Sequence, residues 1–161
     1  MTSCCVEIRL MADDELDAVR ALIRRVFDAC VGPTYTQEGR RQFHAFLQPD
    51  ALRRQQMEND LWIDVATIDN VIVGAIAVHH NTHIAMLFID LDHQGEGLGK
   101  KLMSHTVSKC LKADPNLRAL TVNAAPNAKI FYRHIGFVPV GPKNMIDGLC
   151  FTPMAKTLTD D

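Results

Sequence analysis

Three apolar runs joined by very short turns constrain the fold of this chain more than any other feature. Residues 62–68 and 71–79 have strand-like composition, and Asp69-Asn70 between them favours a tight turn. A second turn signal, Asn81-Thr82, precedes residues 83–91, which are apolar on both faces and are therefore expected in the centre of a sheet. The sequence predicts a meander of three strands in the middle of the molecule.

Apolar residues on both sides of this meander follow mostly helical spacing. Before the meander we expect a strand over 6–10 and helices over about 14–30, 37–47 (capped by Thr36) and 49–58. After it we expect a helix over 97–113, a strand over 120–123, a helix over 128–135 and strands over 137–140 and 149–157. Hairpins combined with helical crossovers imply a mixed sheet with helices on its faces.

Length and composition exclude several classes of protein. A chain of 161 residues favours a single domain over residues 1–161. The formal net charge of −2 provides no general basic field, so no nucleic-acid partner is expected. No apolar stretch approaches the ~18 residues of a membrane span, and residues 1–10 lack a signal-peptide pattern, so no membrane is expected. The five cysteines form no C-x-x-C pair, and their odd number suits reduced thiols in a cytoplasm.

The segment 92–101, Asp-His-Gln-Gly-Glu-Gly-Leu-Gly-Lys-Lys, leaves the third strand of the meander and opens a helix. Its alternating glycines allow a tight turn, and the first helical turn offers unpaired N–H groups at the positive end of the helix dipole. With Lys100 and Lys101 nearby, these features indicate a phosphate or pyrophosphate site. A tight turn and helix cap with two solvated lysines is the simpler alternative. The spacing departs from both the Walker A loop and the dinucleotide fingerprint.

The loop at 94–99 resembles the Q/R-x-x-G-x-G/A loop of the GNAT superfamily of acyl-CoA-dependent N-acetyltransferases. Residues 86–90 look like the central strand of that family, and residues 122–128 and 131–137 are similar to its later strand and helix. The resemblance covers about 61–156. It implies an α+β fold whose mixed, mostly antiparallel sheet of about seven strands is flanked by about four to five helices on both faces.

The resemblance also implies acetyl-CoA as co-substrate and no metal. The loop amides and Lys100 would bind the pyrophosphate of coenzyme A, and the backbone of 87–89 would pair with its pantetheine arm like an added strand. The cofactor-binding residues implied are Leu87, Phe88, Ile89, Gln94, Gly95, Glu96, Gly97, Leu98, Gly99, Lys100, Asn123, Ala125, Ala128 and Phe131. Glu96 departs from the basic or neutral residue of many relatives, so its side chain is expected to point to solvent. Asn123 is also explained as a turn residue before Pro126.

Tyr132 is the candidate general acid, because a phenol near the thioester sulfur can protonate the leaving thiolate. Its helical spacing with Ala128, Phe131 and Ile135 is also typical of a core residue, and taken alone the spacing favours the core. The resemblance favours the catalytic role instead.

A base is needed because an amine acceptor is mostly protonated at neutral pH. His79, His80 and His83 are the candidates, and His83, at the start of the central strand, is expected to face the acceptor. The same histidines could be structural or could bind a metal, although no carboxylate accompanies them. Cys110 and Cys150 lie in apolar patterns typical of the core, which argues against an acyl-enzyme.

The predicted function is transfer of an acetyl group from acetyl-CoA to a primary amine, by direct attack in a ternary complex. The acceptor, a small molecule or a protein, is expected between the N-terminal helices and the later loops, with segment 141–148 as a cover. Candidate lining residues are Tyr35, Phe43, Phe46 and Trp62. A non-catalytic acyl-CoA-binding or regulatory module is the main alternative, and an ATP-using enzyme is a weaker one. Similar proteins are often homodimers, but the sequence leaves the oligomeric state open.

Overall fold

The predicted meander forms the middle of an eight-stranded sheet in the computed structural model, which describes residues 5–146 and 148–158. Its strands β2 (Leu61–Ile68), β3 (Val71–His79) and β4 (His83–Ile89) pair antiparallel in that order. Asp69 and Asn70 have φ angles of 51° and 66°, the left-handed geometry of a tight hairpin turn. The first predicted turn is therefore confirmed.

The whole sheet extends the meander on both sides. Its strand order is β1 (Val6–Leu10), β2, β3, β4, β5 (Ala119–Ala124), β8 (Leu149–Thr157) and β6 (Val138–Pro139), with β7 (Asn144–Ile146) paired to β8. Among the described strands, β4 and β5 form the one parallel pair, and the other pairs are antiparallel. The predicted α+β fold with a mixed, mostly antiparallel sheet is confirmed.

The segment 141–148 is not wholly a loop, because it contains β7. This eighth strand exceeds the predicted seven. A strand of three residues is too short for a period of two to be visible in the sequence, and its pairing with β8 defines it.

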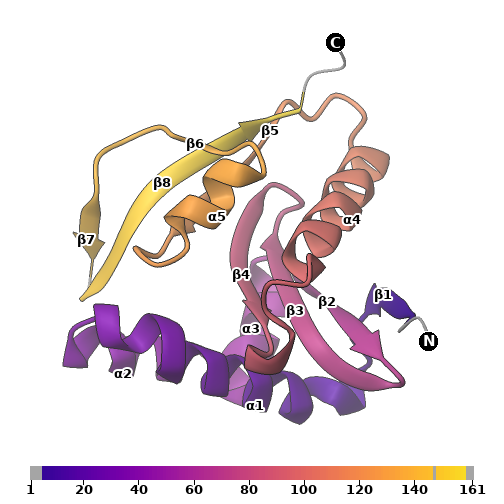
Figure 1. Cartoon of the computed structure of the whole chain (residues 1–161), viewed down its shortest axis with the longest axis horizontal. Helices are drawn as coiled ribbons and strands as arrows, with labels where there is room; N and C mark the ends of the chain where they lie inside the picture. The colour runs from indigo at the N-terminus through magenta and orange to yellow at the C-terminus, as the bar shows by residue number, and fades with distance from the viewer. Residues whose placement is uncertain (1–4, 147, 159–161) are drawn as a thin grey trace.

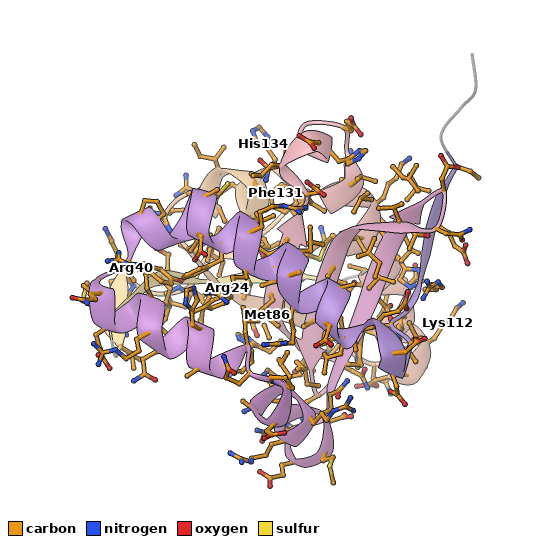
Figure 2. The ribbon with its side chains drawn as sticks, turned by 90° about the horizontal axis from the view of Figure 1, so that it is seen from below. Arg24, Arg40, Met86, Lys112, Phe131 and His134 are labelled. Atoms are coloured by element: carbon orange, nitrogen blue, oxygen red, sulfur yellow. The ribbon has the colours of Figure 1, made fainter. Side chains whose placement is uncertain are left out.

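Five α-helices cover the two faces of the sheet. They are α1 (Leu16–Val26), α2 (Gln37–Phe46), α3 (Pro49–Glu58), α4 (Leu98–Ala113) and α5 (Lys129–His134). Figure 1 shows α1 and α2 along one side of the strands, with α4 and α5 on the other; Figure 2 shows the N-terminal helices in front of the sheet. None of the helices in the described part of the chain is long and apolar enough to cross a bilayer.

A separate apolar core lies on each face of the sheet. On the face of α1, the buried side chains of Val19, Ile23 and Phe27 pack with strand residues such as Met86 and Phe88. On the face of α4, the core includes Leu102, Cys110, Tyr132, Phe137 and Met154. Burial of these two helix stripes holds α1 and α4 against opposite sides of β4.

Local chemistry explains where the N-terminal helices begin and end. Thr36 Oγ1 accepts a hydrogen bond from the Gly39 amide at 3.0 Å, which confirms the predicted cap of α2. Pro49 occupies the first turn of α3, where its missing N–H is not needed. The helix predicted over about 14–30 is α-helical only as far as Val26. Residues Phe27–Val31 follow it as a π-helical turn. This turn brings Cys30 and Val31 to the edge of a cavity described below.

Candidate active site

The centre of the sheet opens between β4 and β5. Parallel pairing joins only His83 to Thr121 and Ile84 to Val122. Immediately afterwards the register between β3 and β4 shifts, so that Ala85 becomes an extra residue opposite Ala77 and Val78. Such a bulge bends a strand and ends its pairing. Figure 1 shows β4 and β8 spreading apart below the point where the two halves of the sheet meet.

The divergence leaves the edge of β4 that faces away from β3 without a strand partner from Ala85 to Ile89. Apart from the Ile89 carbonyl, which accepts a hydrogen bond from Gln94 Nε2, the N–H and C=O groups on this edge have no strand partner and can pair with an extended ligand. This is the arrangement that the resemblance implies for Leu87, Phe88 and Ile89.

A cavity of about 710 Å³, the first cavity, lies along this unpaired edge. It is bounded by the end of β4, the glycine loop and the starts of α4 and α5, and on its other side by the end of α1. Most of the predicted cofactor-binding residues line it: Leu87, Phe88, Ile89, Gln94, Gly95, Gly97, Leu98, Gly99, Lys100, Ala128 and Phe131. Sequence reasoning missed Cys30 and Asn127, which also line it, because their proximity depends on the folded chain.

Each glycine of the loop meets a separate requirement. Gly95 and Gly97 have φ angles of +82° and +85°, where residues with a Cβ are strained. Gly99 is helical, but a Cβ there would lie 2.9 Å from Cζ of Phe131, closer than side chains pack. The three glycines therefore permit two sharp turns and one close packing contact.

The loop presents the N-terminus of a sixteen-residue helix to the first cavity. Lys101 donates the first backbone hydrogen bond of α4, to the Gly97 carbonyl at 3.1 Å. The amides of Leu98, Gly99 and Lys100 precede that bond and carry the positive end of the helix dipole. This geometry suits a phosphate or pyrophosphate group.

Side chains of the loop tie it to its surroundings. Gln94 Nε2 donates to the Ile89 carbonyl at 3.1 Å, and Arg25 Nη2 donates to Asp90 Oδ2 at 2.6 Å. Glu96 does not line the first cavity; its exposed carboxylate lies 3.2 Å from His93 Nδ1. This position agrees with the expectation that Glu96 points to solvent.

Tyr132 lies at the inner wall of the first cavity and is only 5% exposed. Its ring makes edge contacts with Phe131 and Phe137, each at a centroid distance of 5.3 Å. Burial raises the pKa of Tyr132 well above its ordinary value, so the phenol keeps its proton at neutral pH. Tyr132 is therefore both a core residue and a protonated phenol that lines the cavity.

A second cavity, of about 620 Å³, is lined by α2, the first half of β4, β7 and β8. His83 and Asn123 both line this cavity and not the first. His83 Nδ1 lies 2.7 Å from Thr121 Oγ1, across the short parallel pairing. Burial, assisted by the neighbouring His79, holds the pKa of His83 below its ordinary value, so the ring is neutral at pH 7. Ala125 lines neither cavity and packs against the core on the face of α1.

The two cavities adjoin at a pair of aromatic rings. Phe88 lines the first cavity and Phe43 the second, and their centroids are 5.9 Å apart. Along β4, residues 83–86 line the second cavity and residues 87–89 line the first. The bulge at Ala85 thus lies in the part of the strand that lines the second cavity, just before the part that lines the first.

Three of the four residues expected to line the acceptor site come together in one cavity. Tyr35, Phe43 and Phe46 line the second cavity as predicted. The expectation for Trp62 is wrong, because its ring packs with the core on the face of α4, where Lys109 Nζ lies 3.9 Å from the ring centroid. Successive side chains of β2 point to opposite faces of the sheet, and the sequence alone does not say which face Trp62 is on.

Cys110 and Cys150 are both buried. Burial raises the pKa of Cys110 to about 11, so its thiolate is scarce at neutral pH. Both residues therefore fit the core positions that the sequence pattern favours.

Comparisons with known proteins agree with this geometry. Residues 31–158 match the family model described as acetyltransferase (GNAT) domain. A curated protein from Gracilaria tenuistipitata var. liui, "Uncharacterized N-acetyltransferase ycf52", is 39% identical over 67 residues, which are 40% of this chain and 36% of that protein. The chain therefore matches only about a third of that relative's length.

Solved structures extend the similarity to nearly the whole chain. A GCN5-related N-acetyltransferase from Rhodopseudomonas palustris is 22% identical with a TM-score of 0.80, covering 98% of this chain and 99% of that one. The PaiA N-acetyltransferase of Thermoplasma acidophilum, solved with coenzyme A, is 19% identical with a TM-score of 0.76, covering 96% and 99%. Escherichia coli YjaB is 25% identical with a TM-score of 0.67, covering 94% and 97%. By its family match and its fold, the chain belongs to the GNAT acetyltransferases.

Proposed function

We propose that this protein is an N-acetyltransferase that moves an acetyl group from acetyl-CoA to a primary amine, by direct attack in a ternary complex. One observation carries the proposal. A single cavity combines an unpaired strand edge, a helix N-terminus shaped by glycines and a buried phenol. These three features suit an extended amide-bearing arm, a diphosphate and a leaving thiolate, respectively.

The first cavity supports the binding of acetyl-CoA through its backbone. The amides of Leu98, Gly99 and Lys100 would hold the pyrophosphate, and the β4 edge at 87–89 would pair with the pantetheine arm. Ala128 and Phe131 would border the same arm, and Asn127 replaces Asn123 as the amide side chain beside it. Asn123 belongs to the acceptor side in this proposal, since it lines the second cavity.

Acetyl-CoA would supply an activated acetyl group, whose thioester bond to sulfur breaks as the amine nitrogen bonds to its carbonyl carbon. Tyr132 would give its proton to the departing sulfur and later regain, relayed by water, the proton that the attacking nitrogen loses as the amide forms. An N–H group on the free edge of β4 would donate to the carbonyl oxygen as negative charge develops there. His83, neutral at pH 7, would take the amine's proton through water, because it lies at the opposite end of β4 from the first cavity.

Acetyl-CoA titration by calorimetry, followed by a thiol-release screen over amine classes, tests the proposal. Tyr132→Phe keeps the ring packing but removes the proton donor, so kcat should fall about 10²- to 10⁴-fold while acetyl-CoA still binds. Ile130→Val is the control, because Ile130 lies on the same helix, is 71% exposed and lines neither cavity. If acetyl-CoA binds but no amine class releases thiol, the alternative of an acyl-CoA-binding module replaces the enzyme.

A reducing, cytoplasmic setting is part of the proposal. Cys5, Cys30, Cys110 and Cys150 are all free thiols in the described part of the chain. Cys30 is half-buried and lines the first cavity, where a reducing environment would keep it from oxidation.

A further inference from the structure

The second cavity has a predominantly apolar wall. Its lining includes four aromatic rings (Tyr35, Phe43, Phe46 and Phe151) and four large aliphatic side chains (Ile84, Met86, Ile146 and Leu149). Met86 lies beneath the N-terminal helices near the centre of Figure 2. The volume of about 620 Å³ falls within the range of small-molecule sites, so the cavity can hold a compact organic body.

The polar groups of this cavity are few, and among the described lining residues none is a carboxylate, an ammonium or a guanidinium group. No Asp, Glu, Lys or Arg is among the described residues that line it. Its polar side chains are those of Tyr35, Gln42, His79, His83 and Asn123. Among the described lining residues, a second ammonium group would find no carboxylate, and a carboxylate would find no lysine or arginine, so either charge would lack an ion-pair partner among them.

Two nearby arginines supply no cationic partner to the second cavity, because their guanidinium groups contact other parts of the chain. Arg40 Nη1 donates to the carbonyls of Tyr35 and Gly32, at 2.7 and 3.1 Å. Arg24, labelled with Arg40 in Figure 2, lies 3.9 Å from Asp28 on the same stretch of helix. Neither arginine lines the second cavity.

Tertiary contacts hold the cover of the cavity in place. Thr36 Oγ1 lies 3.3 Å from the Gly148 carbonyl, and Gly39 packs so closely on Gly148 that neither position has room for a Cβ. These contacts fasten the start of α2 to the turn between β7 and β8. Ile146 lines the cavity while remaining 53% exposed, so it offers apolar area that an occupant could cover.

We propose that the second cavity binds the acceptor as a primary amine carried on a compact, uncharged, apolar body. The inference rests on the proposed function, which places the acceptor on this side of β4. The amine would lie between His83 and the bulge at Ala85, and the apolar body would pack against Phe43 and Phe46. Diamines, polyamines and amino acids would be poor acceptors because of their additional charge.

Matched pairs of amines test the substrate class directly. Phenethylamine and phenylalanine differ by one carboxylate, and butylamine and putrescine differ by one ammonium group. The kcat/KM values for the uncharged-body members should be at least about tenfold higher within each pair. Equal or higher values for phenylalanine or putrescine would overturn the inference while leaving the acetyltransferase proposal intact.

A charge placed in the cavity should alter this selectivity. Phe46→Glu supplies the missing carboxylate and should raise the putrescine to butylamine ratio by about tenfold. Met57→Glu is the control, because Met57 is 85% exposed and does not line the cavity. Its amine preferences should equal those of the unmodified protein. An unaltered ratio in a folded Phe46→Glu variant would contradict the inference.

Binding provides a readout that does not need turnover. Saturation-transfer NMR with the protein loaded with coenzyme A should show phenethylamine in contact with the protein and putrescine without contact. If no amine is acetylated, the proposed function fails, but this measurement still decides the cavity's preference. The absence of phenethylamine contact, or a stronger signal from putrescine, would overturn the inference.

Discussion

The substitution Gly99→Ala tests how the glycine loop shapes the first cavity. A Cβ at this position would lie 2.9 Å from Cζ and 3.0 Å from Cε1 of Phe131. The ring has to move back by about 0.5 Å to restore ordinary van der Waals contact. Both residues line the first cavity, so the new methyl group and the displaced ring compete with the ligand for the same space.

The expected magnitudes follow from this geometry. Overpacking of this kind costs about 1–3 kcal/mol, while replacing Gly by Ala inside a helix returns about 1 kcal/mol. The free energy of unfolding should therefore fall by no more than about 2 kcal/mol, and Tm by no more than about 8 °C. Acetyl-CoA affinity should fall by at least about tenfold, which is ~1.4 kcal/mol.

Calorimetric titration with acetyl-CoA and a thermal melt measure the two effects separately. Phe131→Leu removes the atoms nearest the new methyl group, so adding it to Gly99→Ala should restore part of the lost affinity. The single variant Phe131→Leu gives the baseline for that comparison. Wild-type affinity in Gly99→Ala would refute the reasoning, as would a double variant that binds no better than Gly99→Ala alone.

Three other predictions concern groups outside the glycine loop. Because burial holds the pKa of His83 below its ordinary value of 6.5, the fall of kcat/KM as this base becomes protonated should have its midpoint below pH 6.5; a pH–rate profile of His83→Gln should lack that decline. Gly39→Ala places a Cβ against the Gly148 carbonyl, so KM for the acceptor should rise about tenfold while calorimetry finds acetyl-CoA binding unchanged. Lys109→Met removes an ammonium group that lies 2.9 Å from the fully buried carboxylate of Asp64, so the free energy of unfolding in urea should fall by about 2–4 kcal/mol. A change below measurement error would contradict the importance of that ion pair.

Much of the fold could be predicted because its signals are local. Tight-turn residues such as Asp69 and Asn70 define the first hairpin of the meander, and Thr36 marks the start of α2. The glycines of the loop at 94–99 predict a sharp turn before a helix. In the structure that loop lies at the first cavity. Turn geometry, capping and helical periodicity depend on residues only a few positions apart, so they can be read without the tertiary structure.

The division of the site into two cavities could not be predicted in this way. It depends on where β4 leaves β5, after His83 has paired with Thr121, and on the bulge at Ala85. These features place His83 and Asn123 in one cavity and Tyr132 in the other.

The amino-acid sequence by itself determined the meander, the glycine-shaped helix start and the family, because backbone preferences and turn chemistry act over short stretches of chain. Only the tertiary structure decided which side chains share a cavity. Strand pairing joins residues tens of positions apart, and a one-residue shift in register turns each side chain to the other face of the sheet.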